Sequence, residues 1–134
     1  MTKFLLLQNY AGTAACDLPM TDWVPGDIKA HIDFQMTLNA ELAGNGELVD
    51  AQGLAGPELA KTVTFDGGRA PVVTDGPFPE SKELLAGYRM IDVESEARAI
   101  EIAAKASAAP GPGGVPIQQP IEVRQVMGAP AGGE

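Results

Sequence analysis

The apolar positions of the chain follow a strand period in some segments and a helix period in others. KFLLLQNYA (residues 3–11) carries a continuous apolar run, which predicts a strand covered on both faces. Val63 and Phe65 alternate with polar residues and precede Gly67-Gly68, a pattern typical of a β-hairpin. Further strands, including the return strand of the hairpin, are predicted at residues 46–54, 70–74, 85–93 and 121–127.

Two segments have the spacing of amphipathic helices, residues 26–43 and residues 94–109. The first helix is expected to bury Ile28, Ile32 and Met36, with Leu38 and Leu42 at the edge of the same stripe. The second is expected to bury Ala97, Ile100 and Ala104. The expected caps are Thr21 or Asp22 before the first helix, Gly44 and Gly46 after it, and Ser95 before the second.

The order of these elements predicts one α+β domain over residues 1–134, a mostly antiparallel sheet with both helices on one face. The other face would stay open and carry apolar residues of the first strand and the hairpin. Because a second copy would cover such a face, we predict a homodimer with two sheets packed together. Residues 108–120 are predicted to form an exposed Pro/Gly-rich loop, and residues 128–134 a flexible tail.

Composition and charge exclude several classes of partner. Nine Lys and Arg residues against 18 Asp and Glu residues give a net charge of -9, which opposes binding to nucleic acid and to anionic membranes. The apolar run FLLL is too short for a membrane span. Cys16, the only cysteine, excludes an internal disulfide and fits a cytoplasmic setting. With a single histidine as well, we predict neither a metal site nor a cofactor.

One stretch resembles the signature of a known family. VTDGPFPESKELLAGYRMIDV (residues 73–93) contains DGPF at residues 75–78, which is similar to the signature of the YCII-related, or DGPF-domain, proteins. The segments LLLQNY, HIDFQMTLNAELAGNGELVDAQGL, TVTFDGGRAPVVTDGPF and IEVRQV occur in the order of that family. The resemblance runs from about residue 3 to about residue 127, and the segment at residues 109–120 departs from it by its length and its Pro and Gly content.

The resemblance implies a ferredoxin-like fold that assembles as a dimeric α-β barrel, an arrangement that small isomerases and monooxygenases share. It also implies a bacterial origin. Wider relatives pair a helix histidine with an aspartate in a cleft proposed to be enzymatic, and one of them is dehydrochlorinase-like. Others lie beside sigma-factor genes, which points to a role in regulation.

His31 and Asp75 are the candidate catalytic residues. His31 falls on the flank of the apolar stripe, so it is either a boundary histidine bonded to a backbone carbonyl or a proton carrier. Asp75 ends a predicted strand before Gly-Pro, so it either caps its own turn or orients an imidazole. Both match the histidine and aspartate of the family.

Five further residues are candidates for substrate contacts. Gly76 would let a ligand approach the backbone closely, and Phe78 would form an apolar wall or join the core. Ser81 and Lys82 match a small hydroxyl residue and a lysine that the family often has. Lys82 would attract an anion or remain solvated, and Tyr10 would line a cleft, an interface or the core.

Three functions remain open. The first is a cofactor-independent enzyme that acts on a small organic molecule, with a proton moved by His31 and the imidazole oriented by Asp75. Isomerisation, elimination or hydrolysis would suit such a pair. The second is a non-catalytic dimeric module that binds a small ligand or serves in regulation. The third is a purely structural dimer that serves a partner protein, and the fold alone does not separate the three.

Overall fold

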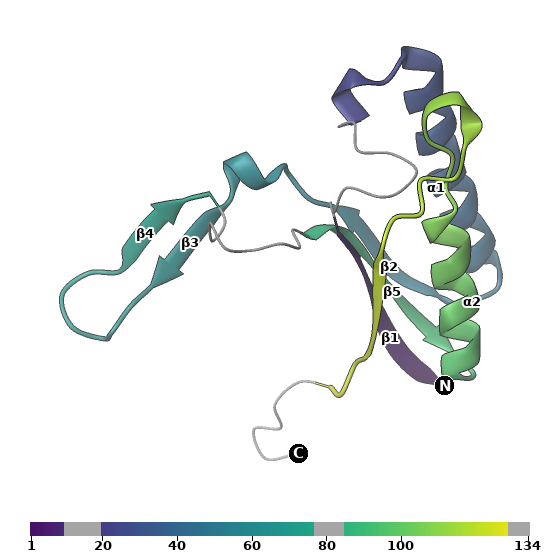
Figure 1. Ribbon diagram of the computed structural model, residues 1–134. Helices are drawn as coiled ribbons and strands as arrows, with labels where there is room; N and C mark the ends of the chain where they lie inside the picture. Colours follow the sequence, from purple (N-terminus) through teal and green to yellow (C-terminus); the bar gives the residue numbers. More distant parts are fainter. Residues whose placement is uncertain (10–19, 77–84, 129–134) are drawn as a thin grey trace.

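A computed structural model describes residues 1–9, 20–76 and 85–128 of the chain (Figure 1). Its main elements are β1 (Thr2–Asn9), α1 (Pro25–Gly44), β2 (Leu48–Gly53), β3 (Lys61–Thr64), β4 (Val72–Asp75), β5 (Leu85–Val93), α2 (Glu96–Ser107) and β6 (Ile121–Gln125). Three short 3-10 turns lie at Met20–Asp22, Pro57–Leu59 and Pro112–Gly114.

Four strands form the main sheet in the order β2-β5-β1-β6, and every neighbouring pair is antiparallel. Helices α1 and α2 cover one face of this sheet (Figure 1). This is the strand order of a ferredoxin-like βαββαβ unit, so the predicted α+β class is confirmed. In the described residues, no helix is both long and apolar enough to cross a membrane.

The hairpin β3-β4 forms a two-stranded sheet of its own, inserted between the second and third strands of the main sheet. We call residues 61–75 the arm. The arm projects from the main sheet on the side away from the helices (Figure 1). The hairpin itself is confirmed. The expectation that its side chains extend the open side of the main sheet is wrong, because in the described residues no strand of that sheet pairs with it.

The buried face of α1 is not the predicted one. Ile32 and Met36 are 46% and 63% exposed, whereas Leu38 and Leu42 are buried together with His31. The physical reason is angular. A spacing of four residues drifts by about 40° per step on a helix of 3.6 residues per turn. The stripe that starts at Ile28 therefore turns away from the sheet within two steps.

The buried face of α2 also differs from the prediction. Ala97, Ile100 and Ala104 are exposed, and the buried residues are Ala99, Ile102, Ala103 and Ala106. Apolar residues occur on both faces of this alanine-rich helix, so only packing against the sheet selects one of them. The alanines allow a close approach of the helix backbone to the strands.

The helix ends agree with the sequence at two of three places. The Ser95 side chain accepts a hydrogen bond from the backbone N–H of Arg98 at 3.2 Å, as a helix cap does. Gly46 has a φ of 73° and ends α1 as expected. The start of α1 differs, because Val24 is its cap position and Pro25 its first residue, while Thr21 and Asp22 lie in a separate turn.

The Pro/Gly-rich segment is folded onto the protein rather than exposed throughout. The Ile117 N–H donates to the carbonyl of Ala109 at 2.9 Å, and the Gly111 N–H donates to that of Val115 at 2.8 Å. Ala109, Gly111 and Ile117 are buried, with Trp23 in the same apolar cluster as Ala109 and Ile117. The segment has little regular structure, and these apolar contacts hold it against the first turns of α1.

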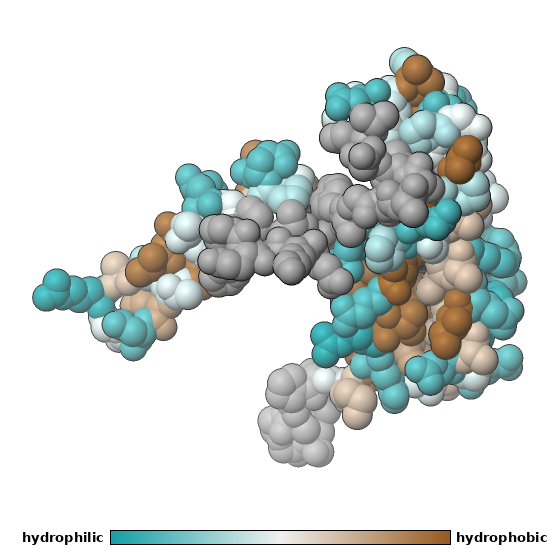
Figure 2. Space-filling view, in the orientation of Figure 1, coloured by the Kyte–Doolittle hydropathy of each residue, from teal (hydrophilic) through white to brown (hydrophobic). Residues whose placement is uncertain are grey.

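The two faces of the main sheet are unequal. On the helix side, Phe4 and Leu6 of β1 are buried in the apolar core. On the other side, Leu5 and Leu7 are only half-buried, so the prediction that β1 is covered on both faces is wrong for the single chain. Figure 2 shows apolar side chains gathered over the strands beside the arm. We call this uncovered side the open face.

Candidate functional site

Four polar residues meet at one end of the interface between α1 and the sheet. His31, Gln35 and Asn39 lie four residues apart on α1, and Arg89 comes from the middle of β5. The spacing of four places the three helix side chains on neighbouring turns. We call these four residues the polar cluster.

Arg89 is the centre of the cluster. Its side chain points to the helix side of the sheet and is only 3% exposed. Its Nε donates to Asn39 Oδ1 at 2.7 Å, and its Nη2 donates to Gln35 Oε1. Both acceptors are amide oxygens, so the hydrogen bonds satisfy donors of the guanidinium without neutralising its charge.

His31 is connected to Arg89 through Gln35. The His31 Nε2 lies 3.3 Å from Gln35 Nε2, and the His31 Nδ1 lies 3.0 Å from the Pro110 carbonyl oxygen. The Trp23 ring stands at 84° to the imidazole, with the ring centres 5.5 Å apart. His31 is therefore held by the Pro/Gly-rich segment, by its own helix and by an aromatic ring.

These contacts select one tautomer of His31. Because Gln35 gives its oxygen to Arg89, it turns its amide nitrogen, which can only donate, toward His31 Nε2. Nε2 must then be the acceptor. Nδ1 carries the proton and donates it to Pro110, since a carbonyl only accepts. The Pro110 carbonyl and the Gln35 amide thus both favour the tautomer of His31 that carries its proton on Nδ1.

The electrostatic setting of Arg89 contrasts with that of Arg98. Arg98 makes two 2.9 Å hydrogen bonds to the carboxylate of Glu47, which raise the pKa of Arg98 and lower that of Glu47. Among the described residues, no carboxylate lies within ion-pair distance of Arg89. Burial instead lowers the pKa of Arg89. A buried cation normally has an anionic partner, so the neutral acceptors of Arg89 distinguish it from Arg98.

Asp75 lies on the arm, away from the polar cluster. Its carboxylate accepts a 2.6 Å bond from Lys61 Nζ, and its side chain is 84% exposed. His31 and Asp75 thus have different partners, and the single chain does not join them by a hydrogen bond. Both residues remain predictions as catalytic groups. The bond of His31 to Pro110 is the backbone contact that one of its two interpretations expects.

Gly76 closes the arm. It has a φ of 81°, which favours glycine, and its N–H donates to the carbonyl of Ala60 at 2.7 Å. Its own carbonyl accepts from the Thr62 hydroxyl at 3.1 Å. The observed role of Gly76 is therefore to form the turn. The other predicted contact residues, Tyr10, Phe78, Ser81 and Lys82, lie outside the described residues.

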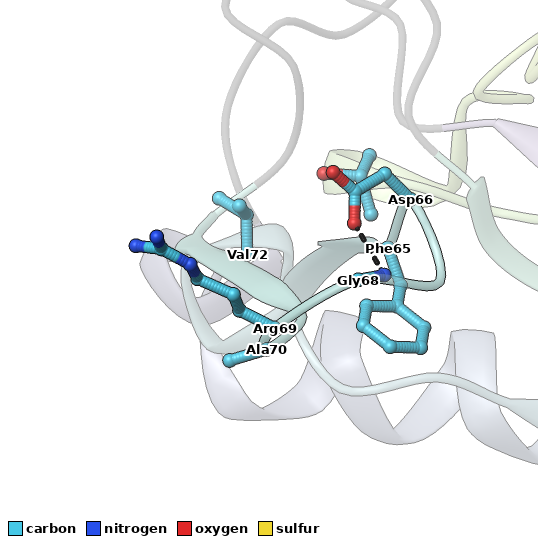
Figure 3. Close-up of a pocket in the computed structure, with 7 residues that line it drawn as sticks. Phe65, Asp66, Gly68, Arg69, Ala70 and Val72 are labelled. Atoms are coloured by element: carbon cyan, nitrogen blue, oxygen red, sulfur yellow. Dashed lines mark hydrogen bonds between the residues drawn. The ribbon is translucent and has the colours of Figure 1, made fainter.

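A shallow hollow lies at the tip of the arm (Figure 3). Its walls include Phe65, Arg69 and Val72, and the Asp66 carboxylate accepts a 2.7 Å bond from the Gly68 N–H. In Figure 3 the side chains of Phe65 and Val72 point to opposite sides of the hairpin. The hollow is therefore bordered by the turn itself and holds no cluster of catalytic groups.

The open face has a polar pair of its own. The Tyr88 hydroxyl donates to Asp50 Oδ2 at 2.8 Å, and Gln52 donates to Oδ1 of the same carboxylate at 3.1 Å. These bonds lower the pKa of Asp50, and the bond to Asp50 raises the pKa of Tyr88. In the described part of the chain, no group of three His, Cys, Asp or Glu side chains is arranged to hold a metal ion.

The sequence interpretation missed three members of the polar cluster, Gln35, Asn39 and Arg89. A signal for Arg89 was present. Alternate residues of a strand share a face, so Arg89 lies on the same face of β5 as Gly87, Ile91 and Val93. A charged residue at a position of the buried face predicts a special environment. Nothing comparable marks Gln35 or Asn39 among the polar residues of α1.

The fold places the chain among the α+β proteins of ferredoxin-like topology. Its polar cluster lies between α1 and the sheet. The chain belongs to the YCII-related family, because the model of the YCII-related domain matches residues 26–117. The matched region includes α1, the arm, β5 and α2, and thus the whole polar cluster. No curated protein matches the chain.

Proposed function

We propose that this YCII-related protein binds a small organic anion, such as a carboxylate, at the polar cluster. One observation carries the proposal: Arg89 is buried, and its acceptors among the described residues are the neutral amides of Asn39 and Gln35. Binding an anion there would compensate a charge that costs folding free energy when it stands alone.

The geometry favours a planar oxyanion. A guanidinium presents N–H donors in a fork that matches the two oxygens of a carboxylate. Gln35 and Asn39 are half-buried, so the helix side of the cluster is nearer to solvent than Arg89 is. A ligand that takes the place of the Gln35 amide would contact Arg89 and His31 together, since Gln35 bridges them.

A thermal-shift screen tests the proposal. Small carboxylic acids are compared with their neutral amides, which have the same shape and lack the charge. The acids are expected to raise the melting temperature and the amides to leave it unchanged. At about 100 times the dissociation constant, a ligand adds about 2.7 kcal/mol to the free energy of unfolding.

The decisive variant is Gln35→Glu. It places a carboxylate beside Arg89 within the chain, so it competes with the ligand and should abolish the response to carboxylic acids. Gln125→Glu, an exposed position at the end of β6, is the control with the same change in charge. Equal responses of the native protein and Gln35→Glu would overturn the proposal, as would a screen in which no acid stabilises the native protein.

A second candidate function is acid–base catalysis on the bound molecule. It is favoured by the tautomer of His31, because Nε2 carries the free lone pair that a general base needs once Gln35 moves. Asp75 of the same chain is bonded to Lys61 on the arm. A His31–Asp75 pair would therefore form between two copies, with each copy supplying one of the residues.

Subunit mixing tests this second function. Molecules that the screen identifies are incubated with the protein, and their conversion is followed by NMR. His31→Ala and Asp75→Asn should each be inactive, while a mixture of the two variants should recover part of the activity. Conversion that survives both substitutions would exclude this pair, and the absence of conversion in the native protein leaves binding as the function.

We also propose a homodimer in which the open faces of two copies pack together. The middle row across this face has an apolar centre: Leu5 and Met90 are neighbours, with Asp50 at the β2 edge and Arg124 at the β6 edge. A two-fold axis along the strands would place Asp50 of each copy near Arg124 of the other. Sedimentation measurements should give twice the monomer mass, and Leu5→Lys should give monomers.

A further inference from the structure

The arm lacks the support that the rest of the described chain has. β3 and β4 pair only with each other, and no helix or strand of the main sheet makes an extensive contact with them in the described residues. A two-stranded hairpin alone is marginally stable in water. An arm of this length therefore needs a surface to lie against.

One face of the arm is apolar. Val63 and Val73 are directly opposite each other. Phe65, the residue after β3, points to the side of the hairpin opposite to Val72 and thus to the side of these two valines (Figure 3). These three side chains are 58%, 57% and 58% exposed. The opposite face pairs Thr62 with Thr74 and Thr64 with Val72, so it is more polar.

The arm also points in a defined direction. It leaves the main sheet on the side of the open face (Figure 1). β3 ends at Thr64 and the bend of the hairpin begins at Gly67, so residues 61–66 cover about 17 Å if they are extended, while stacked sheets are about 10 Å apart. The arm is therefore long enough to reach the edge of a second sheet that is packed on the open face.

We infer that the arm of each copy clasps a second copy of this chain, with the face of Val63, Val73 and Phe65 against it. The inference rests on the proposed homodimer and adds the element that holds the two copies. The net charge of the chain is consistent with a second copy as the partner of the arm. Arg69 at the tip is exposed and makes no ion pair within the described residues, and a chain with a net charge of -9 offers it an acidic surface.

The test replaces the apolar face without removing the strands. Val63→Thr combined with Val73→Thr keeps β-branched residues, so the hairpin is expected to form. The dissociation constant of the dimer, measured by sedimentation, should rise by at least about tenfold. Val72→Thr makes the same chemical change on the opposite face and should leave the dissociation constant unchanged.

A second measurement locates the arm directly. A spin label is attached at Ala70→Cys in a Cys16→Ser background, and this protein is mixed with an isotope-labelled copy without the label. Broadened NMR signals in the isotope-labelled copy are expected. A dimer with no broadening and with unchanged affinity in the double variant would overturn the clasp and leave the homodimer intact. A monomeric native protein would overturn both, and neither result bears on the anion site.

Discussion

The two ends of the layer between α1 and the sheet are built on different principles. At one end Leu42, Ile91 and Val93 are fully buried, and the Arg98–Glu47 ion pair closes the layer at its rim. At the other end Arg89 is equally buried but is bonded to neutral amides. The first end satisfies both packing and charge within the chain. In the described part of the chain, the second leaves the charge of Arg89 without a carboxylate partner, and this difference is the basis of the proposed anion site.

The largest expected effect is at the apolar end. Leu42→Ala removes a side chain with 0% exposure and leaves a cavity. The free energy of unfolding, measured by denaturant titration, should fall by about 2–5 kcal/mol. Met36→Ala on the same helix is the control. Because Met36 is 63% exposed, a loss as large as that of Leu42→Ala would contradict the assigned face of α1.

The ion pair at the rim should have the next largest effect. Glu47→Gln removes one partner of Arg98, both side chains being largely buried, and should cost about 1–3 kcal/mol. The pKa of Glu47 is lowered below 4.5 in the folded chain. Its contribution is therefore present above pH 4.5 and is lost as the pH falls through the folded pKa. Denaturation curves from pH 7 to pH 3 should show a smaller acid loss in Glu47→Gln than in the native protein.

A smaller effect on stability but a clear spectroscopic one is expected at the polar end. Gln35→Met removes the amide that bridges Arg89 and His31, at a cost of about 1 kcal/mol. In the native protein, the nitrogen NMR signals of His31 should report the Nδ1–H tautomer alone. Gln35→Met should keep this tautomer, because the Pro110 carbonyl still accepts from Nδ1–H, and should shift the Nε2 signal, since that nitrogen loses its hydrogen-bond donor. A native His31 protonated at Nε2 would contradict the derived network.

The smallest effect is expected on the arm. Lys61→Met removes the ion pair to Asp75, whose two side chains are 58% and 84% exposed. Exposed pairs contribute less than about 1 kcal/mol, so the free energy of unfolding should change by no more than that. A larger loss would show that Lys61 and Asp75 are covered in solution, and a dependence of that loss on protein concentration would assign the cover to a second copy.

Local patterns determined most of the secondary structure. The strand and helix periods, the Gly67-Gly68 turn, the Ser95 cap and the Gly46 end each depend on residues close together in the sequence, and each is present in the fold. The order of these elements was enough to predict the α+β class. The family, too, was recognisable from DGPF in its sequence context.

Only the tertiary structure decided which faces are buried and which polar groups meet. Ile32 and Met36 look as apolar in the sequence as Leu38 does, and the sheet selects between them. Gln35 and Arg89 are 54 residues apart, and His31 and Pro110 are 79 apart. No local pattern encodes such contacts, because they depend on the rotation of α1 over β5 and on the path of the Pro/Gly-rich segment. The separation of the arm from the main sheet is likewise set by which strands pair, and pairing is decided by the whole chain.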